Sequence, residues 1–235
     1  MHLLLFSNST NPAEKYLEYT LSYIDTFLVK AGRKALFIPY AGISSGFDAY
    51  SDMVQKSLEK ISLEINSIHK IDDKKKAIKT AEIVIIGGGN TFYLLKCLQD
   101  EGLLDVIRKA VIHDTLYIGW SAGSNLACPT IRTTNDMPIV QPLNLNALNL
   151  IPFQINPHYT DFHPPGHAGE TREMRIKEFL LVNRQLYVIG LREGTLLHIK
   201  DKEISLLGSK SCKIFKYGQD PFEVDIGENL DFLMQ

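Results

Sequence analysis

Short apolar runs alternate with helix-like segments through the first two-thirds of the chain, and this alternation restricts the possible folds more than any other feature. The runs that we expect to form strands are residues 2–6, 35–40, 62–68, 82–89 and 116–120. Helical patterns between them cover residues 14–30, 47–60, 72–81, 91–99 and 102–113. Strands that alternate with helices form a parallel sheet covered on both faces. The sequence therefore predicts a doubly wound α/β fold.

The alternation weakens after residue 121. Residues 127–142 are polar and rich in proline, which predicts a loop, and NPHYTDFHPPGH (156–167) is predicted to be a second loop. A helix is expected over residues 169–182, and short strands with antiparallel pairing over 187–191, 195–199, 203–208 and 213–217. No linker interrupts the pattern, and 45 % of the residues are hydrophobic. We therefore expect residues 1–235 to form a single domain.

Composition excludes several classes of protein. The net charge is −2, so bulk charge does not point to nucleic acid or an anionic membrane as a partner. No apolar run approaches the roughly 18 residues of a membrane span, and the start of the chain lacks the basic region of a signal peptide. The three widely spaced cysteines do not predict a disulfide framework or a zinc site. We expect a soluble, cytoplasmic protein.

GWSAG (119–123) follows a predicted strand and fits the G-x-S-x-G pattern. In that pattern a sharp strand-to-helix turn exposes a serine hydroxyl, and glycines stand where a Cβ would clash with a neighbouring element. Ser121 is therefore a candidate nucleophile, and the N–H of Ala122 is a candidate donor to an oxyanion. The alternative is a serine that only caps a helix.

A nucleophilic serine needs a base and a group that orients the base. Histidines gather in the predicted loop over residues 156–167, where loop placement favours function over packing. They are His158, His163 and His167. Candidate acids are Asp136, Asp161, Glu170 and Glu193. Glu193 directly follows an apolar run and precedes a glycine, although such a residue is often an exposed turn carboxylate.

Two other kinds of site can be weighed from the same stretches. His158, Asp161, His163 and His167 could in principle ligate a metal, but their spacing matches no standard pattern, so we expect no metal. GGGNTF (87–92) lacks the spacing of a P-loop or of a dinucleotide-binding turn, so we expect no cofactor. Its glycines allow close backbone approach to a substrate, and the N–H of Gly88 or Gly89 could supply a second oxyanion donor.

Five ordered motifs together resemble the peptidase E family of bacterial α-aspartyl dipeptidases. They are GGGNTF, GWSAGSN, INPHYTD, GETRE and GLREG, and the resemblance extends over nearly the whole chain. It implies a serine peptidase with a fold similar to class I glutamine amidotransferases. Matched motif by motif, it implies Ser121 as the nucleophile, His158 as the general base and Glu193 as the acid.

The resemblance also implies a substrate class, namely dipeptides with an N-terminal aspartate and a free α-amino group. Arg172 in GETRE is the expected partner of the aspartyl side chain, because guanidinium binds carboxylate bidentately. Glu170 or Asp136 is expected to bind the substrate amine. The alternatives are a related hydrolase of aspartyl polymers, similar to cyanophycinase, and a non-enzymatic small-molecule binding module. The sequence leaves open the oligomeric state and any closure of loop 129–142 over the substrate.

Overall fold

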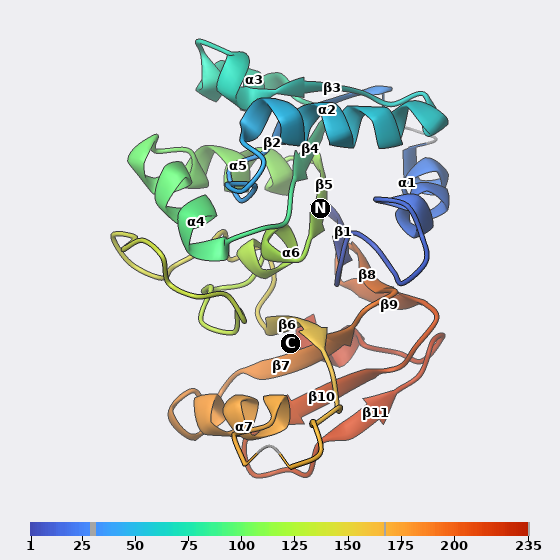
Figure 1. The fold of residues 1–235 in the computed structure, drawn as a ribbon, viewed down its shortest axis with the longest axis vertical. Coiled ribbons are helices and arrows are strands. Elements are labelled where there is room, and N and C mark those ends of the chain that lie inside the picture. Colours follow the sequence, from blue (N-terminus) through green and yellow to red (C-terminus); the bar gives the residue numbers. More distant parts are fainter. Residues whose placement is uncertain (29–31, 167, 235) are drawn as a thin grey trace.

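The computed structural model describes residues 1–28, 32–166 and 168–234. Within these residues the main sheet has seven strands in the order β3-β2-β4-β5-β1-β8-β9 (Figure 1). Their bounds are β1 His2–Phe6, β2 Lys34–Ile38, β3 Glu64–Ser67, β4 Ile83–Ile86, β5 Leu116–Trp120, β8 Thr195–Lys200 and β9 Glu203–Gly208. The first five strands in the spatial order are parallel, and β8 pairs antiparallel with both β1 and β9.

Helices cover both faces of the main sheet. On one face lie α1 Leu21–Phe27 and α2 Phe47–Leu58, and on the other lie α3 Lys74–Thr80, α4 Thr91–Asp100, α5 Leu104–Ile112 and α6 Ala122–Leu126. Alternate side chains of each strand enter different cores: Leu4 and Phe6 pack with α1 and α2, whereas Leu3 and Leu5 join the opposite cluster. The predicted α/β fold with a mostly parallel sheet is confirmed.

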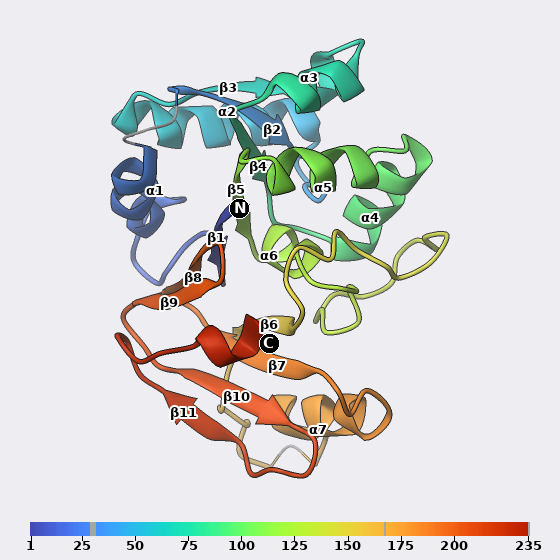
Figure 2. The same cartoon turned by 180° about the vertical axis from the view of Figure 1, so that it is seen from behind.

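A second sheet lies at the carboxyl ends of the main strands (Figure 2). Its order is β11-β10-β7-β6, with bounds β6 Gln154–Tyr159, β7 Tyr187–Arg192, β10 Cys212–Lys216 and β11 Phe222–Val224. Helix α7, Arg172–Val182, packs on it through Ile176 and Leu180. Ser7, at the end of β1, links the two sheets: its hydroxyl donates to the Leu191 carbonyl (2.7 Å) and accepts from the His158 N–H (2.9 Å).

The helix predicted over residues 14–30 is shorter in the structure. Among the described residues of this range, a 3-10 turn (Glu18–Thr20), α1 and Leu28 are helical, and residues 29 and 30 lie outside the described part. Leu17 has φ +59°, which interrupts a right-handed helix, and its N–H donates to the Ser9 carbonyl (2.8 Å). The apolar periodicity is real, but the chain before residue 18 closes a loop instead. Further 3-10 turns are Glu59–Ile61, Ile68–Lys70 and Asp231–Met234.

The prediction of a loop over residues 156–167 is wrong for its first four residues. They belong to β6, which pairs in parallel with β7, and the ladder shifts its register between Pro157 and Tyr159. Polar residues and a proline are typical of loops, but this segment is a strand at the edge of the second sheet, where proline is tolerated. The short strand β11 was also not predicted, whereas residues 127–142 are irregular as expected. No described helix has the length and apolar character needed to cross a membrane.

Candidate active site

Ser121 lies at the turn between β5 and α6, at the carboxyl edge of the main sheet. Its backbone has φ 53° and ψ −111°, a conformation that L-residues rarely adopt, and its N–H donates to the Phe6 carbonyl (3.0 Å). This is the strained turn expected from the G-x-S-x-G pattern.

The glycines around Ser121 are required by contact. A Cβ on Gly119 would lie 2.6 Å from the backbone carbon of Gly123, and a Cβ on Gly123 would lie 2.1 Å from the carbonyl oxygen of Ile86. Helix α6 therefore passes directly against the ends of β4 and β5. The reason given for these glycines from the sequence is confirmed.

His158 is presented by the irregularity in β6. It has φ +55°, and the Asn135 side chain donates to the Pro157 carbonyl just before it (2.7 Å). Its Nε2 lies 2.8 Å from the Ser121 hydroxyl oxygen, and its Nδ1 lies 2.7 Å from Oε1 of Glu193. A bulge of this kind turns a side chain out of the regular alternation, and here it directs the imidazole toward the main sheet.

Glu193 lies in the tight turn between β7 and β8. The N–H of Gly194, which has φ +83°, donates to Oδ1 of Asn8 (2.9 Å). The Tyr19 hydroxyl lies within hydrogen-bond distance of both the Asn8 carbonyl oxygen (2.6 Å) and Oδ1 (2.7 Å). Asn8 follows Ser7 at the carboxyl end of β1. Ser7 and Asn8, which both lie at the end of β1, thus each support a member of the Ser121–His158–Glu193 chain.

Three backbone amides near Ser121 are unpaired within the described part of the chain. Gly87 and Asn90 donate their N–H groups to Ile38 and Ala41, but no acceptor faces the N–H of Gly88 or Gly89. Ala122 is the first residue of α6, so its N–H has no acceptor within the helix. A Cβ on Gly88 would lie 3.1 Å from the Cβ of Ser121, so the glycine segment 87–89 lies beside the serine.

A cavity of about 700 Å³ opens over these groups. Ser121, His158, Gly88, Gly89 and Asp136 line it, together with the apolar side chains of Ile43, Met53 and Ile139. Titratable, nucleophilic and amide groups therefore converge on one concave surface, which is the arrangement expected of an active site.

Of the predicted substrate-binding residues, Asp136 lies in this cavity and Glu170 does not. Oδ2 of Asp136 accepts from the backbone N–H of Thr91 (2.7 Å), from the Thr91 hydroxyl, and from the Thr134 hydroxyl (3.0 Å). Glu170 is exposed and lies 3.6 Å from Arg175, an ion pair on the surface at the start of α7.

Arg172 is the first residue of α7 and is half-buried. No hydrogen bond or ion pair to its guanidinium is formed within residues 1–28, 32–166 and 168–234. Burial and the neighbouring charge of Arg175 lower the pKa of Arg172, and the negative charge of Asp136 partly offsets this. A half-buried cation without an anionic partner is costly, so this position suits the binding of an anion.

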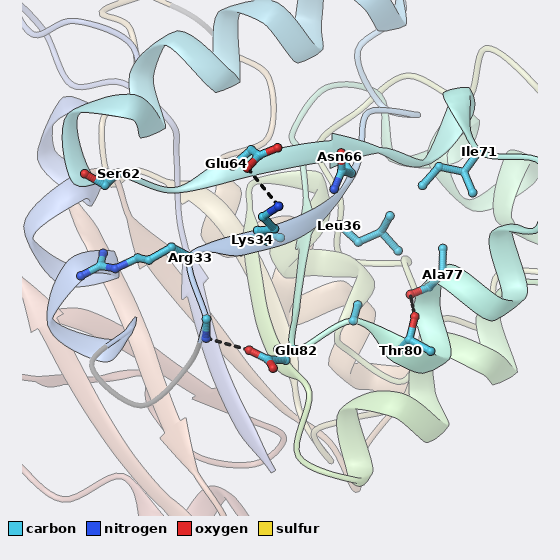
Figure 3. Close-up of a pocket in the computed structure, with 13 residues that line it drawn as sticks. Arg33, Lys34, Leu36, Ser62, Glu64, Asn66, Ile71, Ala77, Thr80 and Glu82 are labelled. Atoms are coloured by element: carbon cyan, nitrogen blue, oxygen red, sulfur yellow. Dashed lines mark hydrogen bonds and ion pairs between the residues drawn. The ribbon is translucent and has the colours of Figure 1, made fainter.

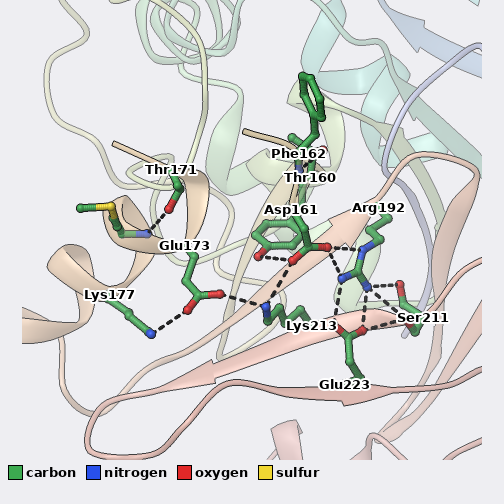
Figure 4. Close-up of polar contacts among 12 residues, drawn as sticks. Thr160, Asp161, Phe162, Thr171, Glu173, Lys177, Arg192, Ser211, Lys213 and Glu223 are labelled. Atoms are coloured by element: carbon green, nitrogen blue, oxygen red, sulfur yellow. Dashed lines mark hydrogen bonds and ion pairs between the residues drawn. The ribbon is translucent and has the colours of Figure 1, made fainter. Parts of the chain in front are cut away.

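The other candidate acids and bases are placed elsewhere. Asp161 pairs with Arg192, which also contacts both carboxylate oxygens of Glu223 (2.7 and 2.8 Å), in a charged network that continues through Lys213 to Glu173 (Figure 4). His163 does not line the cavity, and His167 lies outside the described residues.

A second cavity, of about 720 Å³, lies near the opposite ends of β2, β3 and β4 (Figure 3). Its charged side chains are paired: Lys34 lies 3.6 Å from Glu64, and Glu82 accepts from the N–H of Gly32 (2.8 Å). No histidine or cysteine is among its lining residues. This cavity therefore lacks the base that a nucleophilic serine needs.

Comparison with known proteins agrees with this site. The model of peptidase family S51 matches residues 3–207. The chain belongs to peptidase family S51. It is 50 % identical over 233 residues to a protein named peptidase E from Nostoc sp. (strain PCC 7120), which covers 99 % of this chain and 96 % of the relative. It is 48 % identical over 227 residues to peptidase E of Salmonella newport (strain SL254), covering 97 % and 99 %.

Solved structures show the same fold. A peptidase from an acI-B1 Actinobacterium superposes with a TM-score of 0.66 at 16 % identity, covering 97 % of this chain and 96 % of the other. A protein of Listeria monocytogenes EGD-e, assigned provisionally to peptidase E, gives a TM-score of 0.65 at 23 % identity, covering 89 % and 98 %. The resemblance drawn from five motifs is confirmed, and family membership makes the chain a peptide hydrolase.

Sequence reasoning missed three residues that support the site, namely Ser7, Asn8 and Tyr50. Ser7 and Asn8 directly follow the strand 2–6, as Gly87 and Ser121 follow their strands. Since parallel strands end at one edge, the polar pair after the first strand was a signal for the same site. Tyr50 lies in the middle of a helical pattern and carried no such signal.

Proposed function

We propose that the protein is a serine-type α-aspartyl dipeptidase. The observation that carries the proposal is the hydrogen-bonded chain from Ser121 through His158 to Glu193, because Ser121 and His158 line one cavity beside backbone amides that are unpaired within the described residues. The same three roles follow from the motifs shared with the peptidase E family. A binding module would have no use for a base 2.8 Å from a strained serine.

In the proposed reaction His158 accepts the proton of Ser121 as its oxygen attacks the peptide carbonyl. The resulting oxyanion accepts hydrogen bonds from Ala122 and from the Gly88–Gly89 segment. His158 then gives the proton to the leaving amine, and the peptide C–N bond breaks. Water, deprotonated by His158, hydrolyses the acyl-serine and restores the hydroxyl, while Glu193 orients the imidazole and stabilises its charged form.

Selectivity for aspartate is assigned to Arg172 and Asp136. Within the described residues the Arg172 guanidinium forms no ion pair, which supports a role in binding the aspartyl carboxylate. Of the two acids considered for the substrate amine, Asp136 lines the cavity, and within the described residues only its Oδ2 accepts hydrogen bonds, whereas Glu170 pairs with Arg175 at the surface. We therefore assign the amine to Asp136.

The reaction is expected to occur in the cytoplasm without a metal. Cys97, Cys128 and Cys212 are free thiols, as is usual in a reducing compartment. His158 and Asp161 already bind other side chains, which weighs against their use as ligands.

The deciding experiment is hydrolysis of Asp-Leu compared with Leu-Leu, Glu-Leu and N-acetyl-Asp-Leu, in the presence of EDTA. We expect cleavage of Asp-Leu alone, and its loss in Ser121→Ala with an unchanged circular dichroism spectrum. Failure to cleave any of the four by the wild type would reject the dipeptidase. Cleavage of aspartyl polymers in that case would support the cyanophycinase-like alternative.

A further inference from the structure

The peptide unit between Gly88 and Gly89 is held by a single hydrogen bond within the described part of the chain. The Gly88 carbonyl accepts from the hydroxyl of Tyr50 (3.0 Å), and the Gly89 N–H has no acceptor. The bond is trans, so this N–H points to the side opposite the carbonyl. The direction of the carbonyl therefore decides where the N–H points.

The hydroxyl of Tyr50 can donate only to Gly88. A tyrosine hydroxyl has one proton and two acceptor sites. Trp120 donates its Nε1–H to the Tyr50 oxygen (3.1 Å), and the Tyr16 hydroxyl donates to it at 3.2 Å. With both acceptor sites filled, the proton of Tyr50 remains for the Gly88 carbonyl.

Packing also holds the ring of Tyr50 in place. It is 4 % exposed, and its ring packs edge-on against Phe37 at a centroid distance of 5.4 Å. A Cβ on Gly42 or Gly87 would lie 2.1 or 2.4 Å from its atoms, so the backbone closes on the ring from both sides. Burial raises the pKa of Tyr50 to about 12, so the hydroxyl keeps its proton at any pH at which the enzyme works.

We propose that Tyr50, oriented by Trp120, is a positioning residue that keeps the Gly88–Gly89 peptide turned with the Gly89 N–H toward the oxyanion. This rests on the proposed function, because it assigns the second oxyanion donor to Gly89 in particular. Trp120 immediately precedes Ser121, so one hydrogen-bonded chain connects the nucleophile's strand with the donor's loop.

A device of this kind is needed because glycines flank the peptide on both sides. Rotation of a peptide plane changes ψ of the residue before it and φ of the residue after it, and glycine tolerates such changes at both positions. Without the hydroxyl, the Gly88 carbonyl is free to turn toward the cavity. It would then present a negative dipole to the developing oxyanion in place of an N–H.

Tyr50→Phe tests the proposal because it removes the hydroxyl and keeps the ring. We expect kcat for Asp-Leu to fall by about 10- to 100-fold with KM within about twofold, since the oxyanion forms only in the transition state. The inhibition constant of an aspartyl boronic acid, whose serine adduct carries an oxyanion, should rise by a similar factor. Tyr40→Phe is the matched control, because it removes another buried tyrosine hydroxyl, which donates to Glu101 (2.6 Å) outside the cavity.

The outcomes separate this inference from the proposed function. If wild type cleaves Asp-Leu, Ser121→Ala does not, and Tyr50→Phe keeps its kcat, the inference on Tyr50 is wrong and the dipeptidase stands. An equal loss of kcat in Tyr40→Phe would also overturn the inference, since any lost buried hydroxyl would then suffice. If wild type cleaves none of the dipeptides, the proposed function itself fails.

A crystal structure of the wild type with the boronic acid covers the case in which Tyr50→Phe does not fold. We expect a boronate oxygen within about 3 Å of the Gly89 nitrogen, with the Tyr50 hydroxyl still bonded to the Gly88 carbonyl. A turned peptide, or an oxygen bound to other donors only, would contradict the proposal.

Discussion

Gly119 and Gly123 flank Ser121, and each approaches other backbone more closely than a side chain permits. The strain at Ser121 therefore depends on its neighbours: β4, β5 and α6 leave no other path for the turn. Likewise, Arg172 is half-buried at a helix start, and its guanidinium forms no ion pair within the part of the chain that the structure describes. At the scale of single residues, the backbone strain at Ser121 and the unpaired charge of Arg172 both cost folding free energy, and both lie at groups proposed to act on the substrate.

Gly123→Ala should destabilise the protein by about 3 kcal/mol, because its Cβ would lie 2.1 Å from the Ile86 carbonyl oxygen. Thermal and urea unfolding would measure this. Gly218→Ala is the control: it has φ +75° and no atom within 4 Å of its Cβ, so only backbone strain of about 1 kcal/mol is expected. Equal losses in the two variants would show that contact at α6 is unimportant.

Arg172→Ala should lower kcat/KM for Asp-Leu by about 100-fold, because the aspartyl carboxylate would lose its charged partner. Stability should change little, since the Arg172 guanidinium forms no ion pair with the residues that the structure describes. Arg175→Ala, which removes an exposed arginine on the same helix, should keep kcat/KM within about twofold. An unchanged kcat/KM in Arg172→Ala would assign aspartate recognition to another residue.

At the scale of elements, the second sheet carries His158 in β6, Glu193 directly follows its strand β7, and a charged network connects its strands (Figure 4). Arg192 of β7 bonds Asp161 just beyond β6 and Glu223 of β11, and its guanidinium lies 5.5 Å from the Tyr159 ring centre. His158 and Glu193 adjoin Tyr159 and Arg192 in the chain. The network therefore ties together the strand ends that carry the imidazole and its carboxylate.

Acid should remove the stabilisation that this network gives the folded protein. Hydrogen bonds from Arg192 hold the pKa of Glu223 below its usual value, and bonds from Lys177 and Lys213 do so for Glu173. Folded protein thus binds fewer protons there than unfolded protein, so the stabilisation is present above about pH 4.5 and is lost as pH falls through the lowered pKa values. Urea unfolding across this range should show a shallower pH dependence in Glu223→Gln.

Glu64→Gln is the control for this experiment, because Glu64 is exposed and lies 3.6 Å from Lys34. Its pH dependence should match that of the wild type. If Glu223→Gln also matches the wild type, the network does not contribute to acid sensitivity.

At the scale of the whole molecule, the two sheets share one core. A single apolar cluster includes Leu5 of the main sheet, Leu126 of α6, and Ile155 and Ile189 of the second sheet. Ser7 and Asn8 add hydrogen bonds across the junction. We therefore propose that residues 1–235 fold as one domain, in which separation of the sheets would also separate Ser121 from His158.

One domain should unfold in one transition. Trp120 is the single tryptophan of the chain, so its fluorescence reports on the main sheet. Amide hydrogen exchange of β10 reports on the second sheet. We expect both probes to give the same urea midpoint within error. Exchange of β10 at a lower urea concentration than the tryptophan transition would indicate two separately folding units.

The parallel sheet and its carboxyl-edge site were predictable because their signals are local. Apolar strands with period two, helical stretches between them and glycines at strand ends are written in consecutive residues, so GWSAG and GGGNTF could be placed together at one edge. The residues of the Ser121–His158–Glu193 chain could be nominated for the same reason, with the family resemblance choosing among the histidines and acids.

Only the tertiary structure decided features that depend on distant pairing. The strand at His158 exists because β7 pairs with it. The helix expected before residue 18 does not form, because the Leu17 N–H donates to the Ser9 carbonyl instead. Asp136 and Glu170 look alike in the sequence, but packing brings one into the cavity and leaves the other at the surface. The sequence by itself determined the alternating strands and helices of the main sheet and the residues that could carry chemistry at its edge. Long-range packing decided which groups meet, because hydrogen-bond geometry between segments over a hundred residues apart leaves no mark in either segment alone.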